Sequence, residues 1–149
     1  MKSSESTANG QEVPPSVVTK LTVLGATGSI GINTLEIVRQ FPHKFKIEAL
    51  SCRSSIECLV EQIKEFQPRL VCVDNSEQAR ELRETFRYRN SGTETEFVCG
   101  VEGLIQISID PKVDLVVAGI VGAAGLQPTY SAVQAGKTVA VANKEPLVM

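Results

Sequence analysis

The fold of this chain is decided by the stretch Leu21-Thr22-Val23-Leu24-Gly25-Ala26-Thr27-Gly28-Ser29-Ile30-Gly31. It opens with apolar and β-branched residues, which predict a short buried strand. Three glycines follow in a Gly-x-x-Gly-x-x-Gly pattern, and apolar residues then recur at helical spacing as far as Phe41. This order predicts a strand, a tight turn and a helix whose N-terminus lies at the end of the strand.

Short apolar runs alternate with helical repeats along the rest of the chain, as is typical of a parallel sheet covered by helices. The sequence therefore predicts an α/β fold: a Rossmann-like, doubly wound, mostly parallel sheet with helices on both faces. The expected strands are residues 21–24, 45–50, 70–73, 96–99, 115–117 and 138–141. The expected helices are residues 29–41, 56–66, 77–88, 103–109 and 128–135.

Two expectations concern which side chains are buried. The first helix should turn its apolar residues toward the sheet, namely Ile30, Leu35, Ile37, Val38 and Phe41. The strands at 115–117 and 138–141 are largely apolar and are expected to be buried, as in a parallel sheet. Residues 90–94 are expected to form a turn.

The length of 149 residues favours one domain. Residues 1–16 are rich in Ser, Glu, Asn and Pro without an apolar repeat, so we expect a disordered leader there. Residues 17–149 would form the domain. Because the leader carries Glu5 and Glu12 but no arginine, a plastid transit peptide is disfavoured.

The composition excludes several classes of partner. Lys and Arg total 15 against 17 Asp and Glu, so no strong field attracts nucleic acid or an anionic membrane. No apolar run is long enough to span a bilayer. The four cysteines do not cluster with His43 in a metal-binding pattern. We therefore expect a small-molecule partner, reduced thiols and the cytoplasm of a bacterium.

The three glycines have distinct expected roles at a phosphate-binding turn. Gly25 would permit the tight turn, Gly28 the close approach of a pyrophosphate, and Gly31 the packing of the helix on the strand. Backbone N–H groups at the start of the helix would then meet the phosphate charge. The alternative is a helix start that binds nothing.

The residues after the second strand indicate which nicotinamide cofactor is bound. Proteins that bind NAD usually carry an acidic residue there, to hold the ribose hydroxyls. This chain has Arg53, Ser54 and Ser55 instead, and a guanidinium with two hydroxyls suits a 2′-phosphate. We therefore predict NADPH. The alternative is that Arg53 is solvated and one of the serines caps the next helix.

Small and polar residues follow the later strands, where ligands of such folds bind. The loop at 118–125 contains Gly119, which either lets a flat cofactor lie against the backbone or lets neighbouring elements pack tightly. Asn143, Lys144 and Glu145 follow the last strand. Lys144 can hold a substrate oxygen, while Asn143 and Glu145 can fix ribose or nicotinamide. A plain helix start would explain the geometry there, but not Lys144.

Three segments together resemble the 1-deoxy-D-xylulose 5-phosphate reductoisomerase family. They are LGATGSIG at 24–31, AGIVGAAGL at 118–126 and ANKE at 142–145. Each segment alone is suggestive, and their order and spacing together are specific. The resemblance runs from residue 20 to residue 149 and leaves only the leader outside.

The resemblance implies a reaction and the roles of individual residues. The family rearranges 1-deoxy-D-xylulose 5-phosphate and reduces the product with NADPH to 2-C-methyl-D-erythritol 4-phosphate, in non-mevalonate isoprenoid synthesis. Lys144 would bind this sugar phosphate. The full-length enzyme would be a homodimer that holds Mg or Mn. The residues expected at NADPH are Thr27, Gly28, Ser29, Ile30, Arg53, Ser54, Ser55, Asn143 and Glu145.

The chain departs from the family pattern at three places and stops short of a fourth feature. Ala26 and Pro146 stand where serine is frequent, and residues 53–55 differ from the usual Gly-Lys-Asn or Gly-Ser-Asn. The chain ends at Met149, before the segment that carries the family's Asp and Glu metal ligands. No remaining cluster replaces that site, so we expect NADPH binding without turnover.

Two other functions stay open on the residues alone. An NADP-dependent reductase of the semialdehyde or acylphosphate type would share the Gly-Ala-Thr-Gly turn but would need a cysteine nucleophile. The sequence shows no base near Cys52, Cys58, Cys72 or Cys99. A non-catalytic nucleotide-binding module would fit the short chain, but it would not need Lys144.

Overall fold

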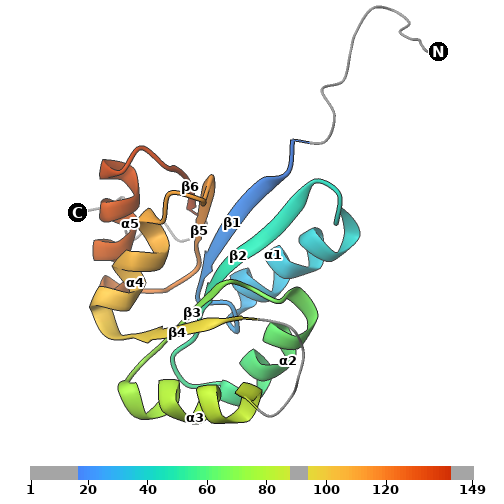
Figure 1. The fold of residues 1–149 in the computed structure, drawn as a ribbon. Coiled ribbons are helices and arrows are strands. Elements are labelled where there is room, and N and C mark those ends of the chain that lie inside the picture. The colour runs from blue at the N-terminus through green and yellow to red at the C-terminus, as the bar shows by residue number, and fades with distance from the viewer. Residues whose placement is uncertain (1–16, 88–93, 142–149) are drawn as a thin grey trace, which may run out of the picture.

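The structure, a computed structural model, describes residues 17–87 and 94–141. These residues form one six-stranded sheet in the order β4-β3-β2-β1-β5-β6, with every neighbouring pair parallel (Figure 1). The predicted Rossmann-like α/β class is confirmed, and the sheet is wholly parallel. The strands are β1 (Thr19–Leu24), β2 (Phe45–Ser51), β3 (Leu70–Val73), β4 (Glu96–Cys99), β5 (Leu115–Ala118) and β6 (Thr138–Val141).

Helices cover both faces of the sheet because the chain adds strands first on one side of β1 and then on the other. From β1 it moves outward to β4, and it then returns across the sheet to β5 beside β1. Right-handed crossovers place the helices of the outward path on one face and those of the return path on the other. The first face carries α1 (Ser29–Gln40), α2 (Ile56–Phe66) and α3 (Ser76–Arg87), and the second carries α4 (Gly100–Ile109) and α5 (Leu126–Gln134).

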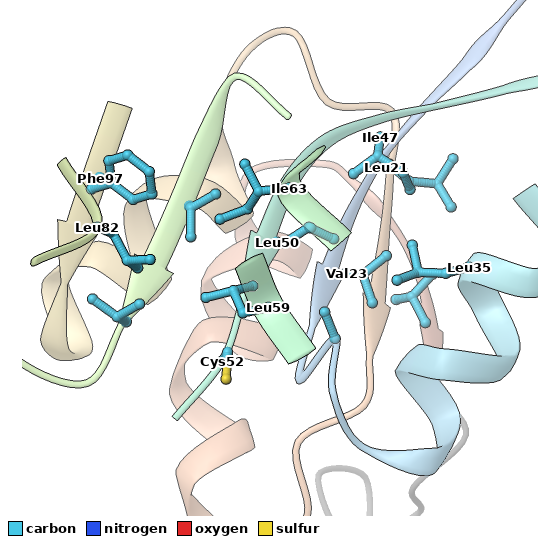
Figure 2. Close-up of a cluster of buried hydrophobic side chains, with 14 of the residues drawn as sticks. Leu21, Val23, Leu35, Ile47, Leu50, Cys52, Leu59, Ile63, Leu82 and Phe97 are labelled. Atoms are coloured by element: carbon cyan, nitrogen blue, oxygen red, sulfur yellow. The ribbon is translucent and has the colours of Figure 1, made fainter. Parts of the chain in front are cut away.

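The larger core cluster lies between the sheet and helices α1 to α3 (Figure 2). Val23 of β1 and Leu50 of β2 are fully buried in it, together with Leu59 of α2. Burying a leucine side chain contributes about 1.5–3 kcal/mol. This cluster fixes the position of α1 and α2 on the strands that carry the glycine turn and residues 53–55.

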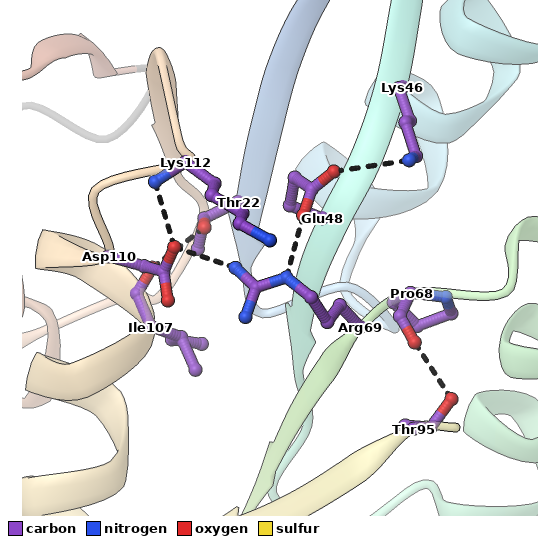
Figure 3. Close-up of polar contacts among 9 residues, drawn as sticks. All are labelled: Thr22, Lys46, Glu48, Pro68, Arg69, Thr95, Ile107, Asp110 and Lys112. Atoms are coloured by element: carbon purple, nitrogen blue, oxygen red, sulfur yellow. Dashed lines mark hydrogen bonds and ion pairs between the residues drawn. The ribbon is translucent and has the colours of Figure 1, made fainter. Parts of the chain in front are cut away.

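A polar network joins β2 to the segment after α4 (Figure 3). The carboxylate of Glu48, 3% exposed, accepts a hydrogen bond from Arg69 Nε at 3.0 Å, and Arg69 Nη2 donates to Asp110 at 2.6 Å. Burial alone would lower the pKa of Arg69, but these hydrogen bonds raise it, so the guanidinium stays charged. The network lies near the amino ends of the strands, away from the glycine turn.

Two predictions about burial are wrong. Ile37 and Phe41 do not face the core, since these residues are 52% and 41% exposed. Ile37 instead borders an apolar hollow beside β5 and β6, a part of the sheet that no helix of the described residues covers on this face. Strand β6 is an edge strand, with Thr138 and Ala140 exposed, so it is not the buried strand that its apolar sequence predicts.

The other elements agree with the predicted order and lie within a few residues of the predicted bounds. Helix α4 is longer than expected, because it starts at Gly100 directly after β4. A short 3-10 turn, η2 (Ala123–Gly125), precedes α5. The leader at 1–16 and most of the turn at 90–94 lie outside the described residues. Within the described ranges no helix is long and apolar enough to cross a membrane.

The core assignment predicts that Leu59→Ala lowers the free energy of unfolding by about 2–5 kcal/mol, because a fully buried side chain leaves a cavity. Urea denaturation would measure the loss. Val133→Ala on α5, where the side chain is 57% exposed, is the control and should change the free energy by less than about 0.5 kcal/mol. Equal losses in the two variants would contradict the assignment.

Candidate functional site

The candidate site lies where β1 and β5 end side by side. Leu24 pairs with Ala118 in the parallel register, and a turn follows each strand. The N–H of Gly119 donates to the carbonyl of Leu24 at 3.0 Å, which ties the two turns together. On one side of β1 the sheet continues with β2, β3 and β4, and on the other side with β5 and β6. Ligands of open α/β sheets bind where the strand order reverses in this way.

The glycine turn, residues 25–28, has a backbone that needs glycine at its first position. Gly25 has a φ of 76°, which L side chains rarely adopt, and a Cβ there would lie 2.9 Å from the carbonyl oxygen of Gly119. The predicted tight turn at Gly25 is therefore confirmed. A Cβ on Gly31 would lie 2.6 Å from Ala26 Cα, so Gly31 packs α1 against the turn itself rather than against the strand.

Gly28 is exposed and opens a cradle at the start of α1. It occupies the N-cap position without a side-chain cap, and a Cβ there would find its nearest neighbour 3.6 Å away. The first hydrogen bond of the helix runs from the N–H of Ile32 to the carbonyl of Gly28. The N–H groups of the preceding helix residues are thus left for another acceptor, and the helix dipole favours an anion there. An anion cradle at Gly28 stays a prediction.

The other predicted residues of this turn differ in accessibility. Ser29 is exposed and Thr27 is half-buried, with Thr27 Oγ1 at 3.5 Å from Cys52 Sγ. Ile30 is partly buried, and its side chain packs against the larger core cluster. The contacts of all three with a cofactor stay predictions.

Packing alone accounts for the small residue at position 119. A Cβ on Gly119 would lie 2.7 Å from the carbonyl oxygen of Leu24 and 3.4 Å from Ile30 Cγ2. Tight packing, one of the two explanations open from the sequence, is therefore supported. A contact between Gly119 and a cofactor stays a prediction.

The loop after β2 presents the expected polar groups to solvent. The Arg53 side chain is 84% exposed, and Ser54 and Ser55 are exposed beside it. Ser55 occupies the N-cap position of α2, but its hydroxyl makes no capping hydrogen bond and so is free for a ligand. The structure adds Asp74, whose Oδ1 lies 4.0 Å from Arg53 Nε. Asp74 directly follows β3, the strand that pairs with β2. Its position at the end of β3 could have placed it near Arg53, and the sequence analysis did not use this signal.

The remaining predicted site residues lie outside the described ranges. They are Asn143, Lys144 and Glu145, which follow the last strand. Among residues 17–87 and 94–141, no group of three or more His, Cys, Asp or Glu side chains could hold a metal ion. The described site therefore offers an anion cradle and a guanidinium, and no donor set for a divalent cation.

The four cysteines are free thiols, and their surroundings differ. Cys72 of β3 is 1% exposed, and burial raises its pKa to about 12, with smaller effects of Cys99 and the Asp74 carboxylate. A thiol with so high a pKa is a poor nucleophile near neutral pH. Cys52 is also buried, whereas Cys58 on α2 is exposed.

Comparison with known proteins gives a consistent result. The family model for 1-deoxy-D-xylulose 5-phosphate reductoisomerase matches residues 21–149. The reductoisomerase of Dechloromonas aromatica is 50% identical over 129 residues, and that of Geotalea daltonii is 51% identical over 128 residues. These matches cover 87% and 86% of this chain but 32% of each relative, so the chain spans about a third of their length.

Solved structures agree with the sequence matches. A DOX-P reductoisomerase in complex with NADPH, fosmidomycin and magnesium superposes with a TM-score of 0.80 at 44% identity, over 89% of this chain and 32% of that one. The enzyme from Zymomonas mobilis in complex with NADPH gives a TM-score of 0.78 at 32% identity, over 88% and 33%. Both favour the reductoisomerase family over a reductase that depends on a cysteine nucleophile.

The thiol environments predict selective labelling by an aromatic disulfide reagent at pH 8. A pKa of about 12 leaves roughly one Cys72 thiolate in ten thousand at this pH, so Cys72 should stay unmodified while the exposed Cys58 reacts. Peptide mass spectrometry would locate the label, with urea-unfolded protein as the control in which both thiols react. Modification of Cys72 as fast as that of Cys58 in the folded protein would contradict the burial described here.

Proposed function

The chain belongs to the 1-deoxy-D-xylulose 5-phosphate reductoisomerase family, and we propose that its residues 17–149 form an NADPH-binding domain. One observation carries this proposal most directly. Helix α1 begins at the point where β1 and β5 end, with no side-chain cap and with an open cradle at Gly28. Such a helix start holds phosphate through backbone N–H groups, without any basic side chain.

Two ends of the cofactor are assigned to two loops. The pyrophosphate lies against Gly28 and accepts hydrogen bonds from backbone N–H groups of Thr27, Ser29 and Ile30. The 2′-phosphate meets Arg53 together with the hydroxyls of Ser54 and Ser55, and all three residues are exposed. Gly31 and Gly25 act indirectly, because they allow the turn and the helix to close on each other.

The reaction itself is proposed for a whole protein of this family, of which this chain covers about a third. NADPH would supply a hydride for reduction of the rearranged 1-deoxy-D-xylulose 5-phosphate. Lys144 would bind this sugar phosphate, while Asn143, Glu145 and Gly119 would position the cofactor. We assign Mg or Mn to no residue of this chain, and we expect the chain alone to bind NADPH without turnover.

The remaining expectations about the whole protein rest on the family resemblance. We propose a homodimer, located in the cytoplasm, that binds neither nucleic acid nor membrane. Free thiols at all four cysteines support the cytoplasm, and the near balance of 15 basic against 17 acidic residues supports the lack of a nucleic-acid or membrane partner.

The assignment of the 2′-phosphate predicts that Arg53→Ala weakens NADPH binding about tenfold and leaves NADH binding unchanged, because only NADPH carries the charge that Arg53 meets. Titration of cofactor fluorescence would measure both affinities. Lys112→Ala removes an exposed charge just before β5, at the amino ends of the strands, and is the matched control that should alter neither affinity. Equal NADPH affinity in Arg53→Ala and wild type would refute the role of Arg53.

The assignment of the pyrophosphate predicts a different pattern for Gly28→Ala. A methyl group fits the folded chain there but occupies the cradle, so NADPH and NADH should both bind at least about tenfold more weakly with little change in melting temperature. Gly31→Ala should instead lower the melting temperature, since its Cβ overlaps the turn. Normal cofactor binding by a folded Gly28→Ala variant would show that the cradle is not the phosphate site.

A further inference from the structure

The glycine turn is held in place by contacts from outside itself. Ser51, the last residue of β2, is 3% exposed and bonds the turn twice. Its hydroxyl oxygen accepts a hydrogen bond from the N–H of Gly25 at 2.8 Å, and its carbonyl accepts one from the N–H of Ala26 at 2.8 Å. The first half of the turn is therefore bonded to the end of β2, the strand that leads into residues 53–55.

A second contact comes from α2. Gln62 is 8% exposed, and its Nε2 donates to the carbonyl oxygen of Ala26 at 2.9 Å. Its Oε1 is buried without a partner, one of two such side-chain atoms among the described residues. A buried acceptor without a partner lowers the stability of the fold, so an apolar side chain would be more stable at this position. The hydrogen bond to Ala26 explains why a glutamine is nevertheless present.

Some backbone N–H groups of the turn are already bonded, and others are free. Those of Gly25 and Ala26 donate to Ser51, and that of Gly28 donates to the carbonyl of Gly25 at 3.2 Å. Those that follow Gly28 precede the first bond of α1 and stay free. The free set follows the turn directly in the chain, so its position depends on where Gly25 and Ala26 are held.

We propose that Ser51 and Gln62 are positioning residues, which hold the glycine turn so that the free N–H groups at the start of α1 converge on the cofactor pyrophosphate. This inference rests on the proposed NADPH site. Neither side chain need touch the cofactor. Both act through the backbone of Gly25 and Ala26, and they link the pyrophosphate end of the site to the β2 and α2 segments that flank Arg53.

The test compares Ser51→Ala and Gln62→Leu with Thr22→Val. Thr22 also makes a buried hydrogen bond from side chain to backbone, to the carbonyl of Ile107 at 2.7 Å, but its partner belongs to α4 rather than to the turn. Thr22→Val thus controls for lost stability. Each variant is titrated at a temperature where it is folded, with NADPH by fluorescence and with adenosine 2′-monophosphate, which lacks the pyrophosphate, by ligand-observed NMR.

The expected result is a split between the two ligands. Ser51→Ala and Gln62→Leu should bind NADPH about tenfold more weakly, because the loss of one hydrogen bond misplaces the turn, while adenosine 2′-monophosphate binding stays within about twofold of wild type. Thr22→Val should bind both ligands with wild-type affinity, even if its melting temperature falls as much as those of Ser51→Ala and Gln62→Leu.

Any of four results would overturn the proposal. NADPH affinity unchanged in Ser51→Ala and Gln62→Leu would show that the turn holds itself. An equal loss for both ligands, or an equal loss of NADPH affinity in Thr22→Val, would mean a general effect on the fold. If wild-type protein binds neither ligand, the NADPH site itself is wrong, and the inference falls with it.

Discussion

The site depends on the close approach of two backbones at the ends of β1 and β5. Gly25 and Gly119 leave no room for a Cβ on either side, since each would meet a carbonyl oxygen of the other turn or strand at 2.9 Å or less. This contact fixes the glycine turn against β5, and α1 then begins where both strands end. A larger residue at either position would separate the turns and move the N-terminus of α1 away from the sheet.

Local signals in the sequence were sufficient to predict most of the fold. Glycine, proline and the change from alternating to helical apolar spacing mark the limits of each element, and the order of elements with right-handed crossovers constrains the sheet. Gly25 is a clear case, because its place between a strand and a helix predicts the left-handed backbone that the structure has. The position of Arg53 beyond β2 could be predicted for the same reason.

What could not be predicted depends on partners distant in sequence. Ser51 and Gln62 carry no motif, and their role emerges only when β2 and α2 lie against the turn. Asp74 reaches Arg53 only because β3 lies beside β2. The exposure of Ile37 likewise depends on which helices cover its face of the sheet, and the spacing of apolar residues cannot predict this. The glycine pattern thus locates the site, while long-range packing determines its geometry.

The central claim is that backbone N–H groups at the start of α1 hold the cofactor pyrophosphate. The most direct test is a titration of ¹⁵N-labelled chain with NADPH, following assigned amide signals by NMR. The account predicts that the largest shifts fall on Thr27, Ser29, Ile30 and Gly31, with a second group at residues 53–55 that NADH does not move. Shifts centred elsewhere on the sheet, or saturable binding that leaves the amides of residues 27–31 unmoved, would contradict it.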